Sequence, residues 1–184
     1  MHIHEPATLA TDYMLTVAAA IFAARLWRTN RMWALAFLFT AFGSFLGGTY
    51  HGFAPQLAPL ASAALWKCTT IAIGLASFFL LAGSERRLSA FALVKFIVYA
   101  SWMIAHDDFI WVIADYGVTL LLVGIVVRTK WVIASILVSV LGAIVQISGN
   151  NVVYHLIQLV ALWLLYRGGK VMNRSTAPRT TQPT

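Results

Sequence analysis

Ionisable side chains stand inside apolar stretches of this 184-residue sequence, where they could do chemistry away from water. Asp12, His51, Lys67, Asp115 and His155 all lie within about 12 Å of the same end of their stretches, at a rise of about 1.5 Å per helical residue. Charged groups are costly inside a membrane, so they are functional candidates by default. Their common depth predicts one polar cavity that opens at that end of the molecule.

The spacing of polar residues within two stretches places them on common helix faces. Asn151, His155 and Gln158 are four and three residues apart, so they share one face of a helix. Ser44 and His51 are seven residues apart, which is about two helical turns, and they also share a face. The pocket residues that this pattern and depth predict are Asp12, Lys67, Asn151 and Gln158.

The same residues have structural explanations, which stay open at this stage. Lys67 can form a buried ion pair with Asp12 or Asp115. His51 can be an interfacial residue at a helix end, and an amide such as Asn151 can join two helices by a hydrogen bond worth about 0.6 kcal/mol. The functional interpretation therefore rests on the shared depth and not on any one side chain.

The elements that must position these residues are membrane-spanning helices. Hydrophobic residues make up 60% of the chain and charged residues 10%, against about 25% charged in soluble domains. Seven apolar stretches have about the 17–25 residues needed to cross a bilayer. The sequence therefore predicts an all-α membrane protein, a seven-transmembrane helix bundle with spans at Thr8–Trp27, Met32–Phe53, Leu60–Gly83, Leu88–Ala105, Asp108–Val127, Trp131–Ser148 and Asn150–Tyr166.

The basic residues predict the orientation of this bundle. Eleven of the thirteen Lys and Arg residues fall in alternate connections or after the last span, which marks that side as cytoplasmic. Lys95, in the inner half of its span, can reach the same interface with its long side chain. We expect an N-terminus outside, a C-terminus in the cytoplasm, a membrane domain over residues 1–170 and a disordered tail over 171–184. The basic charge is thus a topology signal and does not indicate nucleic-acid binding. The short loops fit a bacterial inner membrane.

Two segments resemble a known family. The segments GSFLGGTYHG, with Ser44 and His51, and GNNVVYHLIQ, with His155, are similar to motifs of the seven-helix superfamily of alkaline ceramidases and adiponectin and progestin receptors. That family has a Ser and a His in the second helix, an Asp in the third and an HxxxH pair in the seventh. Its histidines hold a zinc that activates water for hydrolysis of a lipid amide. The resemblance implies zinc ligands at His51 and His155 and a catalytic role for Ser44.

The match to this family is partial. Asn151 stands where the first histidine of the HxxxH pair would be, and the polar residue of the third span is Lys67, a cation. A catalytic zinc has three protein ligands and a water, so the third ligand would have to come from Asp115 or His106. Asp115 could instead act as the general base.

These observations give one functional hypothesis and two alternatives. The hypothesis is a membrane protein whose outward-facing polar pocket binds a lipid or small amphiphile, with metal-dependent amide or ester hydrolysis as its enzymatic form. A bound zinc would lower the pKa of its water to about 7 and so supply hydroxide at neutral pH. The alternatives are a ligand-binding or assembly subunit without catalysis, and a small transporter or proton relay.

Overall fold

The described part of the chain, residues 2–175 of a computed structural model with side chains up to residue 172, is almost entirely helical. All seven of its α-helices are long and apolar enough to cross a membrane, which confirms the predicted seven-helix architecture. The helices are α1 Pro6–Leu26, α2 Arg31–Phe53, α3 Pro59–Ser84, α4 Ser89–Ala105, α5 Ile110–Val127, α6 Lys130–Ile147 and α7 Asn151–Ser175. Short 3₁₀ turns follow α2 at Ala54–Gln56 and precede α4 at Arg86–Leu88.

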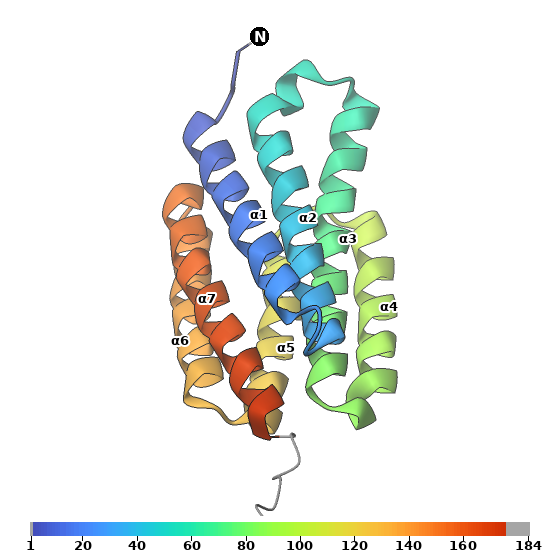
Figure 1. Ribbon diagram of the computed structural model, residues 1–184. Coiled ribbons are helices and arrows are strands. Elements are labelled where there is room, and N and C mark those ends of the chain that lie inside the picture. Colours follow the sequence, from blue (N-terminus) through green and yellow to red (C-terminus); the bar gives the residue numbers. More distant parts are fainter. Residues whose placement is uncertain (1, 176–184) are drawn as a thin grey trace, which may run out of the picture.

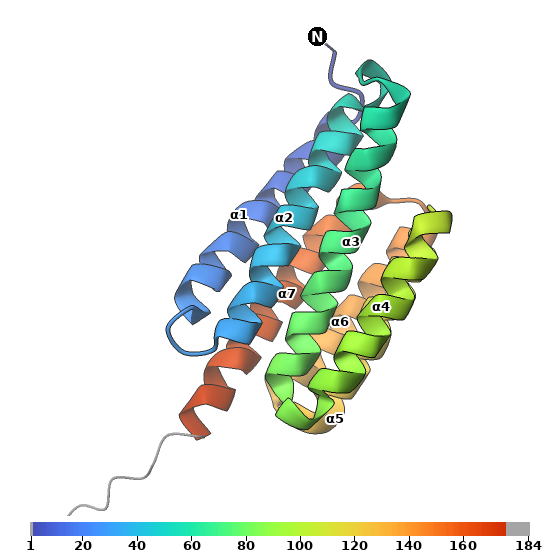
Figure 2. The ribbon, with the colours of Figure 1, turned by 90° about the vertical axis from the view of Figure 1, so that its right-hand side faces the viewer.

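Six of the helices form a closed ring. Going around the ring, α1 packs against α2, α2 against α3, α3 against α5, α5 against α6, α6 against α7, and α7 against α1. The remaining helix, α4, packs mainly against α3 and stands at the edge of the bundle (Figures 1 and 2). The interior of the ring is therefore the place where side chains from distant parts of the sequence meet.

Local sequence signals explain where the helices begin and why the connections are short. Pro6 and Pro59 stand at the first positions of α1 and α3, where a missing backbone N–H costs nothing. The side chains of Asn30 and Thr129 accept hydrogen bonds from the first turns of α2 and α6. Arg128 ends α5 in the left-handed conformation, with φ of 50°, so α6 can turn back at once.

The ring is densely packed at the end that carries the basic connections. Trp33 is fully buried there, against Gly83 of α3 and Gly169 of α7. A Cβ at these two glycines would lie 2.8 and 2.6 Å from the Trp33 ring, so larger residues would push the three helices apart. Leu26 and Leu81 complete this core and are also fully buried. The candidate site lies toward the opposite end of the ring.

The last helix is longer than the sequence predicts. Helix α7 continues to Ser175, nine residues beyond the predicted end of the span at Tyr166. Residues 171–175 of the segment predicted to be disordered are therefore helical, and the rest of that segment, 176–184, lies outside the described residues. The N-terminal segment and the end of α7 lie at opposite ends of the bundle (Figure 1). Which end faces the cytoplasm stays a prediction.

Candidate functional site

A cavity of about 490 Å³ lies inside the helix ring, in the half opposite the Trp33 core. It is lined by α1, α2, α3, α5, α6 and α7, so it involves every helix of the ring. Six of the eight predicted site residues line it: Asp12, Ser44, His51, Asn151, His155 and Gln158.

Close packing of α1 against α2 brings Asp12 to this cavity. A Cβ at Gly48 would lie 2.8 Å from the Cβ of Asp12, and one at Gly52 would lie 2.2 Å from Leu9 Cδ1. Gly47 faces the carboxylate of Asp12 itself, at 3.7 Å from the position of its absent Cβ to Asp12 Oδ2. The glycines of α2 thus let the backbones of the two helices approach, as small residues do between membrane helices.

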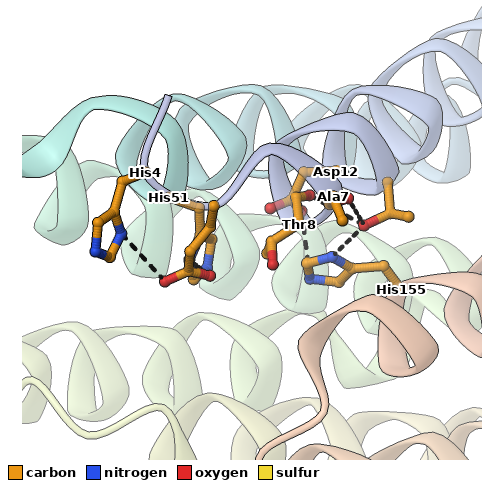
Figure 3. A network of polar contacts seen from close by, with 8 residues as sticks. His4, Ala7, Thr8, Asp12, His51 and His155 are labelled. Atoms are coloured by element: carbon orange, nitrogen blue, oxygen red, sulfur yellow. Dashed lines mark hydrogen bonds and ion pairs between the residues drawn. The ribbon is translucent and has the colours of Figure 1, made fainter. Parts of the chain in front are cut away.

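His155 of α7 points at the first turns of α1 (Figure 3). Its Nδ1 lies 3.1 Å from Thr11 Oγ1, and its Nε2 lies 3.4 Å from Asp12 Oδ1. The hydroxyl of Thr11 donates its own hydrogen to the carbonyls of Ala7 and Thr8, at 3.1 and 3.0 Å. The hydroxyl has one hydrogen, so Thr11 accepts from His155 Nδ1 when that hydrogen is donated to a carbonyl, and donates to Nδ1 when it is not.

The tautomer of His155 decides what can lie between its Nε2 and the carboxylate of Asp12. With the proton on Nδ1, the Nε2 of a neutral imidazole is an acceptor, and the carboxylate that it faces is also an acceptor. In that tautomer, two acceptors at 3.4 Å need a second proton or a cation between them, whereas a proton on Nε2 lets the imidazole donate to the carboxylate directly.

His51 of α2 lies on the other side of the same cavity. Its ring centroid is 6.4 Å from that of His155, and both imidazoles line the cavity. His51 Nδ1 lies 3.1 Å from Glu5 Oε2, at the start of α1. The backbone N–H of His4 donates to the carbonyl of Gly52 at 3.0 Å and so holds the N-terminal segment over His51.

Two buried oxygens of the cavity have no hydrogen-bond partner within the described residues. They are Asp12 Oδ2, on a side chain that is only 6% exposed, and Gln146 Oε1. An unpaired buried acceptor costs about 1–3 kcal/mol, so it commonly marks a place where a ligand, ion or water binds. The cavity therefore presents two acceptors that no donor of the described residues contacts.

The cavity continues from these polar groups into an apolar part that opens between α5 and α6. Leu121, Val140 and Ile144 line it and are nevertheless 57%, 53% and 60% exposed. Gly117 of α5 has nothing within 4 Å of the position of its absent Cβ. Near their connection the two helices close again, because a Cβ at Gly124 would lie 2.5 Å from Ile136 Cδ1.

The prediction that Lys67 pairs with Asp12 or Asp115 is wrong. Lys67 Nζ lies 2.6 Å from Asp107 Oδ1 and donates to the carbonyls of Met103 and His106, at 2.6 and 2.9 Å. These carbonyls belong to the end of α4, where a cation is favoured by the helix dipole. Lys67 therefore joins α3 to α4 and does not line the cavity.

Asp115 and His106 also lie outside the cavity, so neither is placed to complete a metal site with His51 and His155. Asp115 forms an ion pair with Lys95 of α4, and Lys95 also donates to Ser77 at 3.1 Å. The expectation that Lys95 extends to the cytoplasmic interface is therefore wrong. His106 stacks on Trp102 with ring centroids 3.8 Å apart, at the exposed end of α4.

Sequence reasoning missed several residues of the site. Thr11 adjoins Asp12, and Glu5 precedes Asp12 by seven residues, which places both carboxylates on one side of α1. This spacing could have indicated Glu5, whereas nothing in the sequence indicated Thr11. Trp66 and Phe109 line the cavity as well, but aromatic residues are too common near membrane boundaries for their position alone to be informative.

The donors that zinc would need are present but do not converge. Two imidazoles and a carboxylate form a known catalytic zinc set, and the 3.4 Å between Asp12 and His155 is about the separation of two ligands on one tetrahedral zinc. In the described part of the chain, however, no three His, Cys, Asp or Glu side chains are arranged to hold a metal. His51 would have to turn from Glu5 to join the other two.

Comparison with known proteins gives a family but no relative of known activity. No curated protein matches the chain, and no solved structure matches it. One family model, described as a family of unknown function, matches residues 7–174 and thus spans all seven helices almost completely. The chain therefore belongs to this family of unknown function, DUF6962.

Proposed function

We propose that this protein binds a membrane amphiphile in the cavity of the helix ring. The observation that carries the proposal is the division of the cavity into a polar end, at Asp12, His51 and His155, and an apolar part that opens between α5 and α6. A headgroup at the polar end leaves the chain of the amphiphile in the apolar part. The opening between the helices then faces the hydrocarbon of the bilayer, from which an amphiphile can enter without crossing water.

The dimensions of the cavity suit such a ligand. Its lining on α7 extends from Asn151 to Leu162, a separation of eleven helical steps, or about 16 Å along the helix. Its volume of about 490 Å³ lies within the range of about 300–1,000 Å³ that small-molecule sites have. A headgroup with one hydrocarbon chain fits this space better than a full diacyl lipid.

The orientation of the cavity follows from the basic residues. If their side is the cytoplasm, the polar end faces outward, which in a bacterial inner membrane is the periplasm. A cysteine introduced at Gly149 in a Cys68→Ser background should react with an impermeant maleimide added outside intact cells. Reaction only after the cells are opened would reverse the orientation.

Binding can be tested with an uncharged amphiphile and a variant that closes the opening. We expect purified protein to bind radiolabelled monolaurin, and Gly117→Trp to weaken binding at least about tenfold, because the new ring occupies the free space beside α5. The control is Leu137→Trp on α6, at a residue that is 67% exposed and does not line the cavity. Equal loss in both variants, or no binding by the wild type, would contradict the proposal.

Metal-dependent hydrolysis is a second candidate, favoured by the imidazole of His155 and the carboxylate of Asp12, which lie 3.4 Å apart at the cavity. In this form Asp12, His155 and a reoriented His51 would hold zinc, whose chemistry is to supply a hydroxide-like water at neutral pH. Ser44 and Asn151 line the same cavity and would orient the scissile group by hydrogen bonds.

Metal analysis decides this candidate. Protein purified without chelators or a His-tag should contain about one zinc per chain, which Asp12→Asn and His155→Ala should remove. The matched control is Asp108→Asn, in the α4–α5 connection outside the cavity. Metal-free wild-type protein that still binds monolaurin would exclude the hydrolase and leave amphiphile binding in place.

A further inference from the structure

Five aromatic side chains form a closed ring around the polar end of the cavity, named the aromatic collar below. Successive ring centroids are 6.5 Å apart from His51 to Trp66, 6.0 Å from Trp66 to Phe109, and 6.2 Å from Phe109 to Tyr154. The ring closes with 5.2 Å from Tyr154 to His155 and 6.4 Å from His155 to His51. All five separations are typical of aromatic pairs in contact.

The collar is built by helices that are distant in sequence. His51 comes from α2, Trp66 from α3, Phe109 from the residue before α5, and Tyr154 and His155 from α7. All five line the cavity. Trp66 also lines a second pocket of about 560 Å³, so its ring lies between that pocket and the cavity.

The charged side chains of the cavity lining are the next feature. Asp12 supplies a carboxylate, and no Lys or Arg of the described chain lines the cavity. Lys67, the basic residue next to Trp66, is held by Asp107 and by the end of α4. A proton shared by Asp12 and His155 would still leave Asp12 Oδ2 as an unpaired acceptor, as is Gln146 Oε1.

We propose that the aromatic collar binds the positively charged nitrogen of an amphiphile's headgroup. The proposal rests on amphiphile binding in this cavity and specifies the class of ligand. Trp, Tyr and Phe rings attract cations by their negative π faces, and several such rings around one site form the cage that binds a quaternary ammonium. Three rings of the collar are of these types, those of Trp66, Phe109 and Tyr154. An ammonium with N–H groups would in addition donate to Asp12 Oδ2, an acceptor without a partner.

Other headgroups use the site less well. An anionic headgroup meets the carboxylate of Asp12 and finds no Lys or Arg side chain along the described lining. A neutral hydroxyl could donate to the free acceptors but gains nothing from the collar. A positively charged nitrogen is the headgroup that can interact both with the aromatic collar and with an acceptor that has no partner.

The test compares headgroups on one dodecyl chain, by calorimetric titration of the protein in an uncharged maltoside detergent. The probes are dodecyltrimethylammonium, dodecylammonium, a neutral isostere ending in a tert-butyl group, and dodecyl phosphate. We expect at least one of the two cations to bind about tenfold more tightly than the isostere, which is the gain that cation–π contacts give in a desolvated site. Preference for dodecylammonium assigns the gain to the free acceptors, and preference for dodecyltrimethylammonium assigns it to the collar.

Variants separate the collar from general effects on folding. Trp66→Leu and Asp12→Asn should each reduce the preference for the cation to about threefold or less, and Trp66→Phe, which keeps a ring, should retain more of it. The controls are Trp102→Leu, a ring stacked on His106 outside the collar, and Asp108→Asn. Equal affinity for the isostere, or tighter binding of dodecyl phosphate, would overturn this inference while leaving amphiphile binding intact. No binding of any probe would overturn both.

Discussion

Two buried polar clusters of this bundle differ in what surrounds them. The first joins α3, α4 and α5, where Lys95 pairs with Asp115 and donates to Ser77 at 3.1 Å. Ser77 in turn lies 2.6 Å from Thr119 Oγ1. Within the described residues this cluster has no unpaired buried side-chain oxygen or nitrogen, and none of its four residues lines the cavity. It forms a closed unit that fastens α4 to the ring.

The second cluster, around Asp12, His51 and His155, is open. It has an unpaired carboxylate oxygen and adjoins a cavity. Both clusters hold ionisable groups inside the membrane-spanning region, which is the general mark of a functional site. The comparison shows that buried charge alone does not separate function from structure. An unpaired acceptor next to free space does so better, because a satisfied ion pair has no capacity left for a ligand.

The largest expected difference between the clusters is in stability. Lys95→Met should destabilise the protein by about 3–5 kcal/mol, because it leaves the Asp115 carboxylate, whose side chain is 8% exposed, buried without its partner. Replacing both residues, as Lys95→Met with Asp115→Leu, should recover most of the loss. Unfolding in mixed micelles gives both values. A double variant as unstable as the single one would show that the pair does not account for the effect.

Asp12→Asn is the matched change in the open cluster, and its expected cost is less than half of that of Lys95→Met. The substitution weakens the contact with His155, but it also removes a buried charge that has an unpaired oxygen. The same unfolding measurement applies. A loss as large as that of Lys95→Met would mean that the Asp12 cluster is a structural ion pair, and the comparison between the clusters would fail.

The sequence predicted the helices and the depth of the site, because apolar length and the position of a charge along a helix are linear properties. The prediction failed for residues whose partners depend on the direction in which the side chain points around the helix axis. One residue turns the direction by about 100°. Tyr116 lines the cavity while its neighbour Asp115 faces Lys95, so the two residues at one depth belong to different clusters.

Lys67 was assigned to the wrong partner for the same reason. Its depth agrees with that of Asp12, but its side chain points across α3 to the end of α4, where backbone carbonyls without helix partners are available. Those carbonyls cannot be seen in a charge pattern. The aromatic collar was missed because it forms only when four distant segments close the ring.

The smallest expected effect is a coupling free energy from double-mutant cycles, which tests whether Lys67 is independent of the cluster around Asp12. Lys67→Met combined with Asp107→Asn should show a coupling of about 0.2–1 kcal/mol, small because the Asp107 side chain is 71% exposed. Lys67→Met combined with Asp12→Asn should be additive within about 0.3–0.5 kcal/mol, because Lys67 bonds to the end of α4 and not to the cavity. Unfolding free energies of the single and double variants supply both values. A coupling with Asp12 above that with Asp107 would place Lys67 in the cavity, supply the cation that the site otherwise lacks, and remove the basis for recognition of a charged nitrogen.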